Sequence, residues 1–166
     1  MKKLLIILIL FINILGLAGC VKEKNEEVLS KNNFVTVKPD TNGKIIIDTK
    51  DITSTATFVN YKVDEIDGVT IQFIVVRGTD GKVRIAFNTC GACNPSPNAY
   101  FIQVGEYLQC QNCDSKFHID KIGEEKDGCN PAPVEEKEET DNHIIISQAY
   151  ADSYKEKFAN WNGPKA

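Results

Sequence analysis

Two Cys-x-x-Cys pairs are the residues of this chain that are best suited to chemistry. The first pair is Cys90 and Cys93, the second is Cys110 and Cys113, and sixteen residues separate them. A two-residue gap allows both sulfurs of a pair to face one point, and the longer connection brings the second pair from the other side. The spacing therefore predicts a metal centre with these four cysteines as ligands. It does not select the metal, because zinc, iron and iron–sulfur clusters all accept four thiolates.

A fifth cysteine in this region, Cys129, is separated from Cys113 by fifteen residues and lies in the sequence Gly128-Cys129-Asn130-Pro131. Three roles are open for it: a further or exchangeable metal ligand, a partner in a redox disulfide, or a small buried side chain. We favour a role beside the metal. Two structural disulfides are the alternative to a metal centre, but a disulfide within a Cys-x-x-Cys pair closes a very short loop and stabilises little.

The order and spacing of these five cysteines resemble the family of membrane-associated, iron–sulfur-containing FtrD-like domains. The similarity covers about half of the chain and includes the segments Asp67–Val76, Asp80–Phe87 and Gly128–Pro131. It implies electron transfer or iron handling at a membrane, with a membrane-bound redox or metal-transport protein as partner. The implied cofactor is an iron–sulfur cluster bound by the four paired cysteines and Cys129, with a single iron or zinc ion as the alternative.

The same region also resembles the Rieske iron–sulfur fold. Residues Tyr107–Phe117 are similar to the second Rieske box, and Gly128–Pro133 are similar to the proline-bearing loop that covers the cluster. Rieske centres use a histidine in each pair, whereas Cys93 and Cys113 stand at those positions here. The resemblance therefore implies the fold and a ligand arrangement of two tight turns, or knuckles, each carrying one cysteine pair. Four thiolate ligands would, however, lower the reduction potential of a [2Fe–2S] cluster toward that of ferredoxins.

The first nineteen residues have the features of a signal peptide. Lys2 and Lys3 precede the apolar run Leu4–Ile12, which is short for a membrane-spanning helix, and Leu17-Ala18-Gly19 precedes Cys20. This pattern resembles a bacterial lipoprotein signal, which implies cleavage before Cys20 and lipidation of Cys20. An uncleaved amino-terminal anchor is the alternative. Either way the chain is predicted at the outer face of the cytoplasmic membrane, with residues 20–33 as a flexible polar tether.

Residues 34–166 are long enough to form one domain with its own core. The net charge of −4 argues against nucleic acid as a partner. The chain lacks a Gly-x-Ser-x-Gly motif, a phosphate-binding loop and a His-Glu-x-x-His motif, which favours an electron carrier or metal-binding protein over an enzyme. A structural zinc module with an interaction role and a thiol–disulfide redox protein are the alternative functions.

The pattern of apolar residues predicts a mainly β fold of small antiparallel sheets or a barrel. The apolar stretch at residues 73–76 is typical of a strand covered on both faces. Each cysteine pair follows a predicted strand, so two hairpins are expected to hold the knuckles. A solvated loop is predicted for residues 131–139, and the spacing of Tyr150, Tyr154, Phe158 and Trp161 predicts a short amphipathic C-terminal helix. The predicted strands are 34–37, 44–48, 55–61, 69–76, 83–87, 99–104, 107–110, 116–120 and 143–146.

Overall fold

The computed structural model of the protein describes residues 33–63, 68–126 and 128–165. Within these ranges the fold is mainly β, with small sheets, a short C-terminal helix and no closed barrel, so the predicted fold class is confirmed. The signal peptide predicted for residues 1–19, and the tether predicted for residues 20–33 apart from its last residue, lie outside the described residues.

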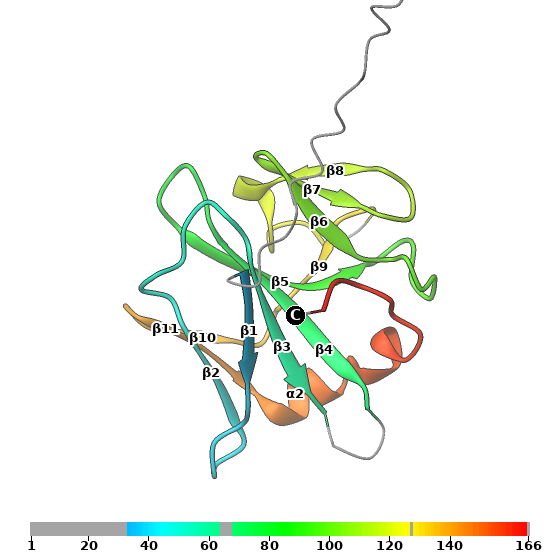
Figure 1. Cartoon of the computed structure of the whole chain (residues 1–166). Coiled ribbons are helices and arrows are strands. Elements are labelled where there is room, and N and C mark those ends of the chain that lie inside the picture. The colour runs from blue at the N-terminus through cyan, green and yellow to red at the C-terminus, as the bar shows by residue number, and fades with distance from the viewer. Residues whose placement is uncertain (1–32, 64–67, 127, 166) are drawn as a thin grey trace, which may run out of the picture.

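Three sheets form the layers of the domain (Figure 1). The central sheet has the order β1-β3-β4-β5-β9, the second sheet β10-β11-β2, and the third sheet β6-β7-β8. All pairs are antiparallel except β1 with β3, which is parallel. The strands are β1 (Phe34–Val37), β2 (Lys44–Asp48), β3 (Thr57–Lys62), β4 (Thr70–Arg77), β5 (Val83–Cys90), β6 (Phe101–Val104), β7 (Tyr107–Cys110), β8 (Lys116–His118), β9 (Pro131–Pro133), β10 (Glu138–Glu139) and β11 (His143–Ser147).

The central sheet is buried on both faces, as the apolar stretch in β4 predicts. Because successive side chains of a strand point to opposite faces, Phe73 and Val75 belong to one core and Ile74 and Val76 to the other. The first core lies between the central and second sheets. The second core lies between the central and third sheets, and it includes Cys90 and the third-sheet residues Phe101, Leu108 and Cys110.

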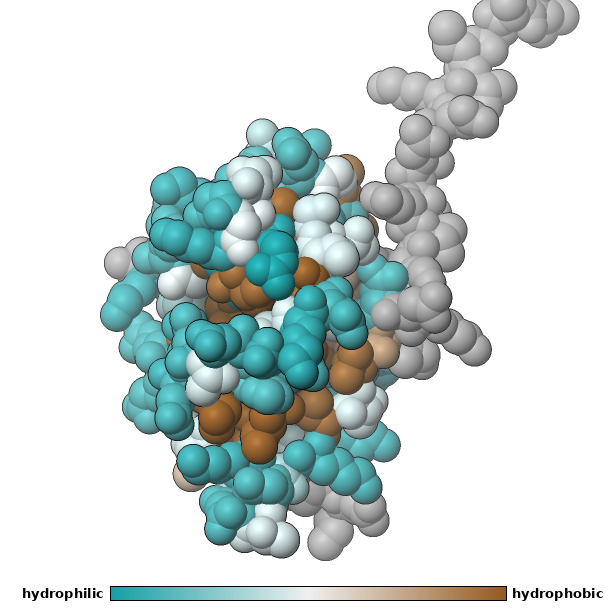
Figure 2. Space-filling model, turned by 90° about the vertical axis from the view of Figure 1, so that its left-hand side faces the viewer, coloured by the Kyte–Doolittle hydropathy of each residue, from teal (hydrophilic) through white to brown (hydrophobic). Residues whose placement is uncertain are grey.

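The second sheet covers the central sheet with one face only. In β2 the buried residues Ile45 and Ile47 alternate with the exposed residues Lys44, Ile46 and Asp48, and Ile46 is 43% exposed. Figure 2 views the molecule from this side and shows a mainly hydrophilic surface broken by patches of hydrophobic residues. This alternation is the pattern expected for an antiparallel sheet with one solvated face.

The aromatic residues near the C-terminus pack on the first core, but they do not share one continuous helix. Helix α2 (Gln148–Asp152) is followed by the 3₁₀ helix η3 (Lys155–Phe158), and Trp161 lies beyond both. The rings of Tyr154 and Phe87 stack with centroids 3.9 Å apart. Packing of the rings onto the central sheet therefore outweighs the weak intrinsic preference of this segment for an unbroken α-helix.

The prediction of a solvated loop at residues 131–139 was wrong for its first part. Residues Pro131–Pro133 form the buried strand β9, which pairs with β5 at the edge of the central sheet. Proline cannot donate a backbone hydrogen bond, so it suggests a loop by sequence, yet it is compatible with an edge strand. The charged residues that follow are exposed, and Glu138–Glu139 form the short strand β10.

A buried polar network joins the end of β5 to three other parts of the fold. The side chain of Asn88 donates to Gln72 Oε1 over 2.7 Å, and its Oδ1 accepts from the backbone N–H of Phe101 over 2.7 Å. The indole N–H of Trp161 donates to the carbonyl oxygen of Asn88 over 2.8 Å. Asn88 and Gln72 have no exposed surface. The network thus fixes the strand that precedes Cys90.

We expect Asn88→Ala to lower the free energy of unfolding by about 2–4 kcal/mol, because it leaves the buried N–H of Phe101 and the buried Oε1 of Gln72 without the partner that Asn88 supplies. Urea denaturation of the metal-free protein measures this loss. Asn142→Ala, made at an exposed asparagine, is the matched control and should change stability by less than about 0.5 kcal/mol. Equal effects of the two substitutions would contradict the proposed importance of the network.

Candidate metal centre

The first cysteine pair lies at the end of β5 and in the turn after it. We call residues 90–94 the first knuckle. The backbone N–H of Cys90 donates to Ala99 O over 2.9 Å, and the N–H of Asn94 donates back to Cys90 O over 3.0 Å. The backbone N–H groups of Ala92 and Cys93 point toward the sulfur of Cys90. This is the arrangement in which a knuckle stabilises a thiolate with its own amides.

The second pair repeats this geometry at the end of β7. In the second knuckle, residues 110–114, the N–H of Cys110 donates to Ser115 O over 2.9 Å and the N–H of Asp114 donates to Cys110 O over 3.0 Å. Asp114 has φ of 59°, a left-handed conformation that aspartate tolerates better than most residues. The N–H of Gln111 donates to Tyr100 O over 2.8 Å and so joins the second knuckle to the chain that follows the first.

Cys129 is fastened to the first knuckle by the backbone on either side of it. The N–H of Gly91 donates to Asn130 O over 3.3 Å, and the N–H of Ala92 donates to Gly128 O over 3.2 Å. Gly128 has φ of 97°, which L side chains rarely adopt. We call residues 128–130 the Cys129 loop. Its two hydrogen bonds to the first knuckle place a fifth sulfur beside Cys90.

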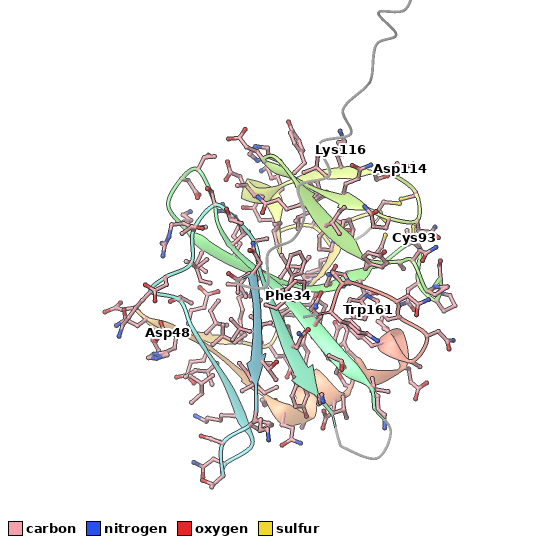
Figure 3. All side chains as sticks on the ribbon, in the orientation of Figure 1. Phe34, Asp48, Cys93, Asp114, Lys116 and Trp161 are labelled. Atoms are coloured by element: carbon pink, nitrogen blue, oxygen red, sulfur yellow. The ribbon has the colours of Figure 1, made fainter. Side chains whose placement is uncertain are left out.

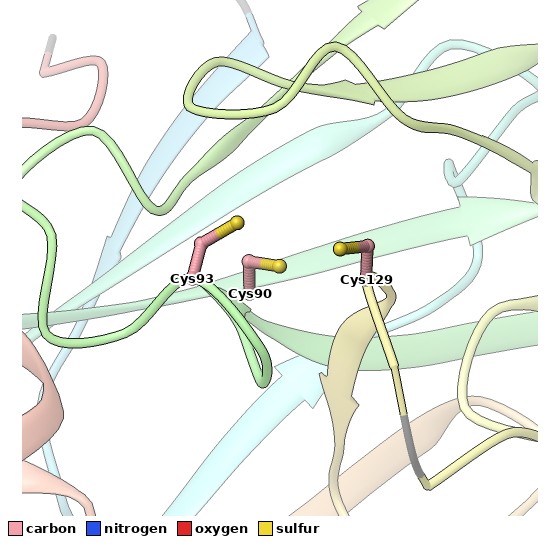
Figure 4. Close-up of side chains that lie close together, drawn as sticks. All are labelled: Cys90, Cys93 and Cys129. Atoms are coloured by element: carbon pink, nitrogen blue, oxygen red, sulfur yellow. The ribbon is translucent and has the colours of Figure 1, made fainter.

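The structure brings all five predicted site cysteines together as free thiols. The sulfurs of Cys90, Cys93 and Cys129 lie within 4.8 Å of one another, as do those of Cys93, Cys110 and Cys113. In Figure 4 the sulfur of Cys129 points toward that of Cys90, from the opposite side of the site. Figure 3 shows Cys93 and Asp114 on the side of the molecule away from Asp48 of β2. The site therefore lies at the edge of the second core, far from the second sheet.

Exposure differs strongly between the sulfurs. Cys90 and Cys110 are fully buried, Cys93 and Cys129 are half-buried, and Cys113 is exposed. Burial raises the pKa of Cys90 and of Cys93, and contact with the Cys113 sulfur together with burial raises the pKa of Cys129. The hydroxyl and backbone N–H of Ser115 lower the pKa of Cys113 to about 6. The exposed thiol is thus the one that ionises most readily.

Sequence analysis did not identify two residues that shape this site. Ser115, whose Oγ lies 3.4 Å from the sulfur of Cys113, stabilises the ionised form of that thiol. Asn88 positions β5 through the buried network described above. A signal for Asn88 is present in the sequence, because the polar pair Asn88-Thr89 stands between the apolar run Ile85–Phe87 and Cys90. His118, near the second pair in sequence, has its Nδ1 accepting from the N–H of Asp120 rather than facing the sulfurs.

The donor set and its surroundings define a class of protein. Five free thiols cluster at one site on the β scaffold, and soft thiolates select iron, zinc, copper(I) or iron–sulfur clusters. The residues present therefore fit a thiolate-ligated metal or an iron–sulfur centre.

A comparison with protein families also indicates an iron–sulfur protein. The family model of membrane iron–sulfur containing FtrD-like proteins matches residues 52–158, and this chain belongs to that family. No curated protein and no solved structure matched the chain, so the likeness to the Rieske fold stays a prediction. The family is described as membrane-associated, while none of the helices in the described ranges has the length and apolar character needed to span a bilayer.

In the reduced, metal-free protein, we expect iodoacetamide to alkylate Cys113 before the other clustered cysteines. The thiolate is the reactive form, so the rate at Cys113 should rise with pH through a midpoint near 6, whereas burial keeps Cys90 protonated and inaccessible. Peptide mass spectrometry after brief labelling identifies the modified residue.

Ser115→Ala is expected to shift the midpoint for Cys113 upward, because it removes the hydroxyl that stabilises the thiolate. Ser147→Ala, in the helix cap of α2, serves as a control that should not move it. Labelling of Cys90 ahead of Cys113 would contradict the assignment.

Proposed function

We propose that this protein is a lipid-anchored electron carrier at the outer face of the cytoplasmic membrane. Its thiolate-ligated iron or iron–sulfur centre passes electrons to a membrane-bound redox or metal-transport protein. The observation that carries this proposal is the convergence of five free cysteines in a member of a membrane iron–sulfur family. The metal centre would supply a one-electron redox couple, which no side chain of the cluster supplies alone.

The burial of the sulfurs supports this role. Cys90 and Cys110 are fully buried, which would shield the centre from water and lower its exposure to oxidants. Cys113 is exposed and would bring one edge of the centre to the surface. A partner that docks beside the second knuckle would therefore come close to the metal without entering the fold.

A thiol–disulfide redox role is the second candidate function. It is favoured by the pKa of about 6 for Cys113, which the neighbouring thiol of Cys129 helps to lower. Such a protein would exchange two electrons between a dithiol and a disulfide and would contain no metal. Metal analysis and thiol counting of the purified protein separate the two functions.

The full chain, purified anaerobically from membranes, is expected to contain iron and to absorb visible light. The absorption should bleach on reduction by dithionite, with a matching change in the electron paramagnetic resonance spectrum. Cys90→Ser and Cys110→Ser should each lose most of the iron and the absorption, because metal binding and folding are coupled at such sites.

A colourless protein with stoichiometric zinc would overturn the electron-carrier proposal in favour of a structural zinc module, since zinc has no accessible redox chemistry. A metal-free protein with an oxidised cysteine pair would favour the thiol–disulfide alternative.

The tether gives a separate prediction. Cys20→Ser should prevent lipid attachment and move the protein from the membrane fraction to the soluble fraction, because polar residues follow position 20 in the sequence. Its iron content should stay that of the parent chain. An unmodified amino terminus in membrane-extracted wild-type protein, found by mass spectrometry, would show that the protein is not lipidated.

A further inference from the structure

The arrangement of the five sulfurs differs from that of a single tetrahedral site. Four thiolates around one ion with bonds of about 2.3 Å lie about 3.8 Å from one another. Here no four of the described cysteine sulfurs lie within 4.8 Å of one another; instead they form two groups of three. The first triad is Cys90, Cys93 and Cys129, and the second triad is Cys93, Cys110 and Cys113.

Cys93 is the member common to both triads. Its sulfur lies 3.9 Å from that of Cys110 in the second triad, and it also contacts the sulfur of Cys90 in the first. Cys90 and Cys110, by contrast, each belong to one triad only. A thiolate sulfur has more than one lone pair and can bind two metal ions at once, so a shared position is chemically available to Cys93.

The position of Cys129 is built into the fold. Backbone hydrogen bonds from Gly91 and Ala92 hold the Cys129 loop on both sides of the cysteine, and β9 continues this loop as a strand of the central sheet, with Pro131 opposite Cys90. A cysteine that only filled space would not require its sulfur to face that of Cys90 (Figure 4). The first triad is therefore as well supported by the backbone as the second.

Charge favours the use of all five sulfurs. Four thiolates around one divalent ion leave two net negative charges, whereas five thiolates around two divalent ions leave one. Because Cys90 and Cys110 are fully buried, the smaller net charge costs less to keep out of water.

We propose that the centre holds two metal ions, one in each triad, and that the thiolate of Cys93 binds both. This inference rests on the proposed function and specifies the metal site within it. Each ion would receive three protein sulfurs, so a tetrahedral ion in either triad would keep one position for a small neutral ligand such as water. Cys129 would then be a ligand of the first ion only.

Cobalt(II) tests the number and the coupling of the ions without relying on redox activity. The reduced, metal-free full chain in detergent is titrated with Co²⁺, and the thiolate-to-cobalt absorption is followed. We expect the absorption to rise until two equivalents per chain are bound. The paramagnetic resonance signal should grow with the first equivalent and fall with the second, because a shared thiolate couples the two spins.

Variants assign each ion to its triad. Cys129→Ser is expected to halve the stoichiometry to one equivalent and to keep an uncoupled cobalt signal, with circular dichroism confirming that the fold is retained. Cys20→Ser makes the same atomic change at the remaining cysteine and should keep both equivalents. Cys93→Ser should abolish the magnetic coupling between the two cobalt ions. If this variant fails to fold, the titrations of the parent chain and of Cys129→Ser still decide whether two ions bind.

Binding of one equivalent by the parent chain would overturn the two-ion proposal, as would two equivalents in Cys129→Ser. Loss of an ion in Cys20→Ser would also overturn it, and two uncoupled cobalt signals would overturn the sharing of Cys93. None of these outcomes bears on whether native iron carries electrons. Conversely, a zinc-containing native protein would refute electron transfer and leave the cobalt stoichiometry unaffected.

Discussion

A sheet with apolar side chains on both faces needs a cover on each, and the position of the cysteines depends on this constraint. Strands β3, β4 and β5 place large side chains alternately above and below the central sheet. The second sheet and the C-terminal aromatic residues cover one face, and the third sheet covers the other. Because β7 belongs to the third sheet, covering that face also brings the second knuckle over the first. Hydrophobic burial therefore positions the ligands.

Backbone hydrogen bonds then hold the sulfurs close together at some electrostatic cost. Thiolates repel one another, and burial together with the neighbouring sulfurs raises the pKa of Cys90, Cys93 and Cys129, while Ser115 lowers that of Cys113. The two knuckles and the Cys129 loop are tied to one another through the backbone N–H groups of Gly91, Ala92 and Gln111. A metal ion that binds here displaces protons from the thiols. In the electron-transfer role proposed above, preorganisation of this kind would limit how far the sulfurs must move.

Much of this architecture can be predicted from the sequence, because it depends on local patterns. The predicted ranges 34–37, 44–48 and 107–110 coincide with β1, β2 and β7, and the apolar stretch of β4 correctly indicated a strand buried on both faces. Strand β9 was not predicted because its prolines are typical of a loop, and its pairing with β5 depends on the tertiary fold. The cysteine spacing likewise predicted convergence but not two triads, since the partners of Cys129 depend on hydrogen bonds to a distant knuckle. Long-range pairing leaves little trace in a single sequence.

The prolines of β9 also affect the tendency of the protein to aggregate. As the last strand of the central sheet, β9 occupies an edge, and an exposed edge can pair with a strand of a neighbouring molecule and start aggregation. Pro131 and Pro133 have no N–H to offer such a strand, and β9 is only three residues long. A strand of another molecule would therefore find too few backbone N–H donors at β9 to extend the sheet. The segment that carries the fifth cysteine into place therefore also protects this edge of the sheet against intermolecular β-pairing.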